Sequence, residues 1–396
     1  VNEVGQSFTL SELAELSTSN PELRRNELMT RVKGAEAIAL ARGDVGLFVT
    51  TTLPSRFHAV SDRYDGSTPR QGQAALCIGW ARSRALLAKE GIRLYGMRVA
   101  EPHLDGTPHA HALIFCAPHQ VERVKAVLRE RALEESPNED GAQRHRFTCE
   151  RINSEMGSAV AYVSKYLAKN VDGFQLEMTL ARKKDGGWEL VDKNPQTAAE
   201  RIRTWASTWG IRQFQFFGLP PVTWWRELRR LREGCVSPVI EEARAPADAG
   251  DYAGHVTAVG GVCKPRADLA LCTWRTYESA ADGQPATNRY GEPSPPKLCG
   301  VGELGRKLYV EVGPQPLYRL SWNEEPVMLA RELTRVHTWE VVINAPASAP
   351  APWTRVNNCN QPGELAGDSA GLAGPDLPDF YRPGARPPRL HPPPGG

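Results

Sequence analysis

The chain has 396 residues, 41% of them hydrophobic and 24% charged, which is enough apolar material for one or two ordinary globular cores. The formal net charge of +2 gives no bulk electrostatic signal for a nucleic-acid or membrane-surface partner, so any such signal must be local. The sequence contains no run of about 18 apolar residues and no signal-peptide pattern, so no membrane association is expected.

The eight cysteines are spread through the chain without the tight, even spacing of a disulfide framework or a Cys-x-x-Cys zinc pair. Reduced thiols and a cytoplasmic location are therefore expected. The first residue is Val rather than Met, which suggests a fragment or a processed chain.

The first third of the chain alternates helical and strand patterns. Residues 1–44 form an N-terminal helical segment with plausible helix starts at Ser11 and Asn20. The apolar, β-branched run 46–53 (GLFVTTTL) predicts a buried strand. Residues 71–89 then predict a helix that ends at a glycine.

Two strand-like runs follow, 92–101 and 109–116, joined by the turn-rich sequence HLDGTP, which predicts a hairpin. Residues 121–133 predict a helix, 146–152 a strand and 156–169 a further helix. This order of elements predicts an α+β fold with a ferredoxin-like split βαβ and one extra helix. The expected sheet is antiparallel and central, ferredoxin-like or RRM-like, with helices on one side.

The main folded domain is expected over 45–233, because an arginine- and aromatic-rich stretch continues it to about 233. Residues 234–345 are rich in Gly, Pro, Ala and Cys and predict an irregular region of unknown role, with isolated strands at 307–313 and 337–345. Residues 346–396 are dominated by Pro and Gly and predict a disordered tail, since few large apolar groups could offset the ordering entropy.

Two histidines at i and i+2 on one predicted strand give the first chemical signal. Side chains alternate along a strand, so His109 and His111 point to the same face. Glu101 ends the preceding strand, and a hairpin could bring its carboxylate beside both rings; His103 is a competing third ligand. Two imidazoles and one carboxylate suit a catalytic divalent ion with open positions. The alternative is a solvent-facing strand with polar residues.

Two tyrosines on the predicted helix 156–169 give the second signal. Residues four apart share a helix face, so Tyr162 stacks on Tyr166, and Lys165 on Lys169. A cation near a phenol favours the phenolate that could attack phosphorus. The alternative is two core tyrosines with two solvated lysines.

These features together resemble the HUH endonucleases, and within them the two-tyrosine rolling-circle initiators of the bacteriophage replication gene A group. The resemblance covers about residues 20–233 and fades beyond. Its motifs are RRNELMTRVKGAE (24–36), FVTTTLPSRFHA (48–59), MRVAEPHLDGTPHAHALIF (97–115), AYVSKYLAKNVDG (161–173) and WGIRQFQFFGLPPVTWWRELR (209–229).

The resemblance implies an HUH endonuclease domain that nicks single-stranded origin DNA and starts rolling-circle replication. Glu101, His109 and His111 would hold Mg²⁺ or Mn²⁺, and Tyr162 or Tyr166 would form a 5′-phosphotyrosine and leave a free 3′-OH. The second tyrosine would serve the rejoining of ends. The partners implied are origin DNA and a host helicase and polymerase, in the cytoplasm of a bacterial host cell.

Further candidate DNA contacts lie near the first strand and in the basic, aromatic stretch before 233. They are Thr50, Thr52, Arg56, His58, Arg203 and Arg212. Strand propensity explains the threonines almost as well, and packing explains most of the neighbouring aromatic residues.

Other functions stay open on the sequence alone. A two-tyrosine HUH transposase would share the chemistry, whereas the relaxases carry their tyrosines before the histidine strand. A metal-stabilised DNA-binding module without cleavage would keep the histidines and use the tyrosines for packing. A cupin-like metalloenzyme would need further ligands that the sequence does not offer.

Overall fold

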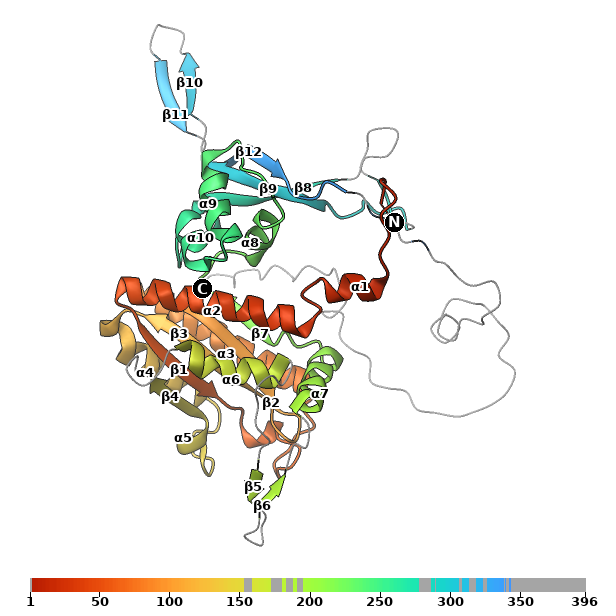
Figure 1. Cartoon of the computed structure of the whole chain (residues 1–396). Coiled ribbons are helices and arrows are strands. Elements are labelled where there is room, and N and C mark those ends of the chain that lie inside the picture. The colour runs from red at the N-terminus through yellow and green to blue at the C-terminus, as the bar shows by residue number, and fades with distance from the viewer. Residues whose placement is uncertain are drawn as a thin grey trace, which may run out of the picture. The chain divides into compact units, whose positions relative to one another are not determined.

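The central element is a five-stranded sheet in a computed structural model (Figure 1). The structure describes residues 2–152, 159–171, 180–182, 188–190, 195–277, 286–288, 290–305, 308–312, 318–322, 326–337, 339 and 342. In spatial order the strands are β4 (Phe147–Arg151), β1 (Val45–Thr51), β3 (Pro108–Cys116), β2 (Tyr95–Pro102) and β7 (Phe214–Phe217). All neighbouring pairs are antiparallel, so the predicted α+β class with an antiparallel sheet is confirmed.

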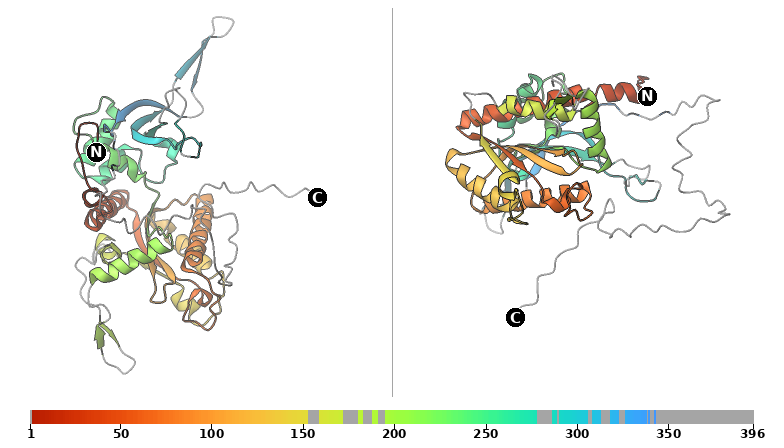
Figure 2. Two further views of the ribbon diagram at one scale, coloured as in Figure 1. Left: turned by 90° about the vertical axis from the view of Figure 1, so that its right-hand side faces the viewer. Right: turned by 90° about the horizontal axis from the view of Figure 1, so that it is seen from below.

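Helices cover both faces of this sheet, and the prediction of helices on one side is wrong. In the view from below, the sheet lies between α2 and α3 (Figure 2). One core joins α2 and α6 to Phe48 and Leu113, and the other joins α3 and α4 to Leu47 and Ile114. The central strands are apolar on both faces, and an apolar face must be buried against another layer.

The helices begin and end where their sequence caps them. The Asn20 side chain accepts from the Glu22 amide, and the chain leaves α2 through Gly43 at φ 70°. Thr68 and Gln71 form a capping box at the start of α3. The helices of this part are α1 (Leu10–Glu15), α2 (Pro21–Arg42), α3 (Pro69–Lys89), α4 (Val121–Ala132), α5 (Ala142–His145), α6 (Ala159–Val171) and α7 (Pro195–Thr208).

The predicted hairpin is confirmed and fixes the register of β2 and β3. Glu101 lies opposite His109 in the antiparallel pair. The turn closes with the His103 amide donating to the Thr107 carbonyl at 2.8 Å, and Gly106 takes a φ of 82°. A shift by one residue would send the three side chains to different faces.

The region expected to be irregular, 234–345, instead contains helices and a three-stranded sheet. These are α9 (Pro238–Asp248), α10 (Tyr252–Ala258), β8 (Leu271–Thr276), β9 (Lys297–Gly305) and β12 (Val327–Leu333). With α8 (Val222–Leu228) they enclose a separate core around Trp224, Ile240 and Leu271. The buried members of this core are mostly large apolar residues, but they are spread over 224–301 among many Gly and Pro residues, and the composition therefore conceals the core.

Two short hairpins complete the described chain. They are β5 (Leu180–Arg182) with β6 (Trp188–Leu190), and β10 (Leu308–Val312) with β11 (Tyr318–Trp322). The strand predicted at 307–313 is therefore paired rather than isolated. Of the strand predicted at 337–345, Trp339 forms a single bridge to Asn2. The predicted disordered tail, 346–396, lies outside the described residues.

Trp224 offers a test of the third core. Its side chain is fully buried, and its indole N–H donates to Thr273 Oγ1 at 3.1 Å. We expect Trp224→Ala to lower the free energy of unfolding by about 3–5 kcal/mol, the usual cost of deleting a buried aromatic side chain. Trp224→Phe, which keeps most of the volume, should cost clearly less. Urea denaturation of both variants gives the comparison, and equal losses would contradict this packing.

Candidate metal centre

The three predicted metal ligands converge on one point of the sheet. Glu101 ends β2, and His109 and His111 lie on β3 beside it. The Nε2 atoms of the two histidines are 2.9 Å apart, and Glu101 Oε2 lies 4.0 Å from His109 Nε2 and 3.9 Å from His111 Nε2. All three side chains are buried, and the exposed fraction of Glu101 is 0%.

This donor set fits a divalent cation. Ligands about 2.0–2.2 Å from one ion lie about 3–4 Å from each other, which agrees with the three separations. A buried carboxylate also needs a compensating positive charge or hydrogen bonds, since burial without them costs several kcal/mol. Two nitrogens and one oxygen leave coordination positions open for a substrate, unlike a closed structural zinc site.

Hydrogen bonds from a second layer of residues hold two of these ligands. Thr50 on β1 lies opposite His111, and its Oγ1 is 2.9 Å from His111 Nδ1. When Nε2 binds a cation, Nδ1 carries the proton and can donate to Thr50, which would hold the tautomer and the ring orientation. The Asn170 amide donates to Glu101 Oε1, and Gln213 Nε2 donates to Asn170 Oδ1 at 3.4 Å.

A further histidine pair borders the site. The centre of the His103 ring lies 4.2 Å from the centre of the His109 ring and 5.2 Å from that of the His58 ring. His58 Nδ1 is 3.1 Å from Asp105 Oδ2 in the hairpin turn. Among the described residues, however, the group of converging ligand atoms contains Glu101 rather than His103.

Helix α6 brings Tyr166 onto the same face of the sheet. Its ring lies 4.4 Å from the His111 ring and 4.9 Å from the Phe48 ring. Burial raises the pKa of the Tyr166 phenol, and the charges of Glu101 and Glu150 raise it further. A raised pKa favours the neutral phenol over the phenolate.

The other predicted residues of this helix are placed by their backbone alone. Tyr162 lies one turn before Tyr166 on α6, and Lys165 and Lys169 lie on the same helix. The side chains of these three residues fall outside the described part of the structure. Their roles as second nucleophile and as cations near the phenols stay predictions.

The predicted DNA contacts are not gathered into one cluster. Arg56 pairs with Asp65 at 2.6 Å and with Glu135, so carboxylates already compensate its charge. Thr52 Oγ1 donates to the His145 carbonyl at 3.0 Å. The two predicted arginines beyond α6 lie elsewhere in the chain. Arg203 is half-buried on α7, and Arg212 is exposed and comes shortly before β7. None of these contacts tests DNA binding.

The sequence did not single out Asn170, Gln213 or Phe48. Asn170 lies within the motif AYVSKYLAKNVDG, and Gln213 comes directly before β7. An amide at the end of a helix is common on solvated surfaces, so only the folded contacts identify these residues as part of the site.

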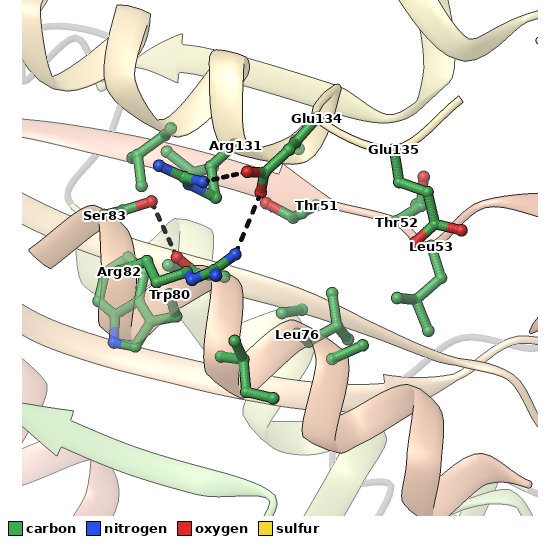
Figure 3. A pocket seen from close by; sticks show the side chains of 18 of the residues that line it. Thr51, Thr52, Leu53, Leu76, Trp80, Arg82, Ser83, Arg131, Glu134 and Glu135 are labelled. Atoms are coloured by element: carbon green, nitrogen blue, oxygen red, sulfur yellow. Dashed lines mark hydrogen bonds and ion pairs between the residues drawn. The ribbon is translucent and has the colours of Figure 1, made fainter. Parts of the chain in front are cut away.

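A cavity of about 280 Å³ lies on the opposite face of the sheet, between α3 and α4 (Figure 3). Val49, Ala110 and Ala112 form its apolar floor, and these residues alternate with the site residues along β1 and β3. At its rim Glu134 accepts from Arg131 at 2.6 Å and lies 3.6 Å from Arg82. The cavity shares no lining residue with the metal centre, so it belongs to the packing of α3 and α4.

The known proteins that are similar in sequence to this chain include several phage replication proteins. Residues 1–174 match the family described as bacteriophage replication gene A protein. The replication protein of Haemophilus phage HP1 is 39% identical over 87% of this chain and 43% of its own length. The replication gene A protein of Escherichia phage P2 is 34% identical over 94% of this chain and 48% of its own length.

A prophage protein and one solved structure extend the comparison. A probable replication endonuclease from a prophage-like region of Salmonella paratyphi A is 35% identical over 96% of this chain and 46% of its own length. The chain thus spans about half the length of the curated relatives it matches. Aminoacylhistidine dipeptidase from Vibrio alginolyticus aligns at 14% identity over 49% of this chain and 45% of that chain, with a TM-score of 0.20, which carries no argument.

Among the described residues no helix is long and apolar enough to cross a bilayer.

The Thr50 hydrogen bond can be tested by metal binding alone. We expect Thr50→Val to weaken Mn²⁺ binding by about 10-fold or more, because second-layer partners of metal-ligating histidines typically contribute 10–100-fold in affinity. Isothermal titration calorimetry measures this directly. Thr52→Val is the matched control, since it also removes a hydroxyl bond but one made to the His145 carbonyl. Similar affinities for both variants would mean that Thr50 does not orient His111.

Proposed function

Since the chain belongs, through residues 1–174, to the bacteriophage replication gene A protein family, we propose that it is a DNA endonuclease that initiates phage or prophage replication. The relatives named replication protein, replication gene A protein and replication endonuclease support this proposal. The observation that carries it is the convergence of Glu101, His109 and His111 beside the Tyr166 ring.

The proposed reaction is nicking of single-stranded origin DNA by a tyrosine, as in the HUH endonucleases that the sequence resembles. The sheet order β4-β1-β3-β2, with β3 antiparallel to its two neighbours, supports this fold assignment. The site is supported by two histidines at i and i+2 on β3, and by α6, whose Tyr166 ring packs against His111.

Glu101, His109 and His111 would hold the cation, Mg²⁺ or Mn²⁺. Bound there, such an ion supplies Lewis-acid polarisation of a non-bridging oxygen of the scissile phosphate. The chain itself supplies orientation: Thr50 fixes the His111 ring, and Asn170 fixes one carboxylate oxygen of Glu101. Burial of all three ligands keeps bulk water from competing at the inner side of the site.

The step exchanges one phosphodiester for another. The phenolic oxygen of Tyr166 or Tyr162 forms a bond to phosphorus, the bond from phosphorus to the 3′ oxygen breaks, and the phenolic proton ends on that oxygen. The products are a 5′-phosphotyrosine and a free 3′-OH, from which a host polymerase could extend after a host helicase opens the duplex. Lys165 and Lys169, on the same helix, would favour the ionised phenols.

Covalent trapping tests this proposal. Labelled single-stranded DNA with candidate origin sequences is incubated with the protein and Mg²⁺ or Mn²⁺, and adducts are resolved on denaturing gels. We expect a DNA adduct that EDTA prevents, that at least one of Tyr162→Phe and Tyr166→Phe retains, and that the double variant lacks. Glu101→Gln should lower the adduct rate by about 100-fold or more, since even second-layer changes at metal sites cost 10–100-fold.

The matched control is Tyr95→Phe, which removes a phenol hydroxyl from the same core but one that donates to Asp44 at 2.8 Å. Its adduct rate should stay near that of the unaltered chain. An adduct that persists in the double tyrosine variant would overturn tyrosine chemistry. DNA binding with no adduct under either metal would favour a non-cleaving module, and cleavage confined to transposon ends would favour a transposase.

A further inference from the structure

The two carboxylate oxygens of Glu101 have different partners. Oε2 faces the Nε2 atoms of His109 and His111 at 4.0 and 3.9 Å. Oε1 instead accepts a hydrogen bond from the Asn170 side-chain amide. One oxygen is therefore offered to the metal centre while the other is held by the protein.

The Asn170 amide has a determined orientation. Its exposed fraction is 0%, and its Nδ2 also lies 2.7 Å from the backbone carbonyl of Tyr166, one turn earlier on α6. Its Oδ1 accepts from Gln213 Nε2 at 3.4 Å. Both N–H groups and the carbonyl are thus used, and a flipped amide would set an acceptor against two acceptors.

This contact restricts how Glu101 can bind a cation. A carboxylate with both oxygens free can bind one ion through one oxygen or through both. Two-oxygen binding would turn Oε1 toward the histidines and away from Asn170, and where that motion broke the hydrogen bond it would leave a buried, unpaired N–H at a cost of about 1–3 kcal/mol. The contact therefore favours binding through Oε2 alone and leaves one more position for phosphate or water.

We propose that Asn170 is a positioning residue that holds Glu101 to single-oxygen coordination and ties the tyrosine helix α6 to the metal centre. The inference rests on the proposed metal-dependent function. Through the Tyr166 carbonyl and the Glu101 carboxylate, the same amide links the backbone of the nucleophile to a ligand. Gln213, placed just before the edge strand β7, holds the amide in this orientation.

The proposal separates metal affinity from turnover, which a merely structural role would not do. In Asn170→Ala, Oε1 of Glu101 loses this hydrogen bond, and with it the constraint that Asn170 places on two-oxygen binding. We expect Mn²⁺ affinity to stay within about 3-fold of the unaltered chain or to rise, while the rate of adduct formation falls by about 10-fold or more. An Asn170 that only stabilised the fold would lower both together.

The experiment counts water on bound Mn²⁺ in the protein without DNA, by electron–nuclear double resonance in ¹⁷O-labelled water. With a six-coordinate ion and three protein ligand atoms, the unaltered chain should keep about three waters. Asn170→Ala should keep one fewer. Ser164→Ala is the matched control on α6, since it removes a bond from a side chain to the Ala161 carbonyl without touching Glu101.

A second variant covers the case in which Asn170→Ala does not fold. Gln213→Ala leaves Asn170 in place but removes the donor to its carbonyl, so the amide is held less firmly against Glu101 and the same changes should appear in weaker form. Equal water counts in the unaltered chain and in both variants would overturn the Asn170 proposal while the metal function stands. An unaltered chain that binds no Mn²⁺ and forms no adduct would overturn the proposed function itself.

Discussion

A carboxylate buried at the end of a central strand is the constraint around which the site is organised. Glu101 has no exposed surface, and an ionised carboxyl in that position is tolerated only with hydrogen bonds or positive charge beside it. In the structure, the Asn170 amide from α6 donates to one oxygen of this carboxylate, and two imidazoles from β3 face the other oxygen. Three different elements therefore have to meet for this one side chain to be stable.

The same alternation that builds the core builds the site. Leu113 and Phe115 follow His111 on the same face of β3, so the metal centre continues the core that α2 and α6 cover. Because α6 must pack on this face to bury its apolar residues, Val163 and Leu167 also fix where Tyr166 lies. The position of the tyrosine is thus a consequence of core packing as well as of the site.

Features that depend on residues close together in the sequence could be predicted, whereas features that depend on contacts between distant residues could not. The triad depends on one hairpin, whose turn and strand pattern lie within a short stretch, and the structure brings its three residues together. Asn170 and Gln213 depend on contacts across 69 and 43 residues of chain, which no local pattern reveals. Leu47 and Val49 make the second face of β1 apolar, but a short run that is apolar at every position does not show which helices cover each face. In 238–333 the buried apolar residues are widely spaced among Gly and Pro, so their local pattern is too weak to predict a core.

Burial gives the site a polarity that chemistry has to overcome. Desolvation and the charges of Glu101 and Glu150 all raise the pKa of the Tyr166 phenol and so favour its neutral form. Positive charge near Glu101 would offset that residue's share of the effect and leave the shares of desolvation and Glu150. The Asn170 amide donates both to Glu101 Oε1 and to the Tyr166 carbonyl, so one side chain joins the proposed metal ligand to the helix that carries the proposed nucleophile. Burial, charge and hydrogen bonding therefore all couple the surroundings of Tyr166 to those of Glu101.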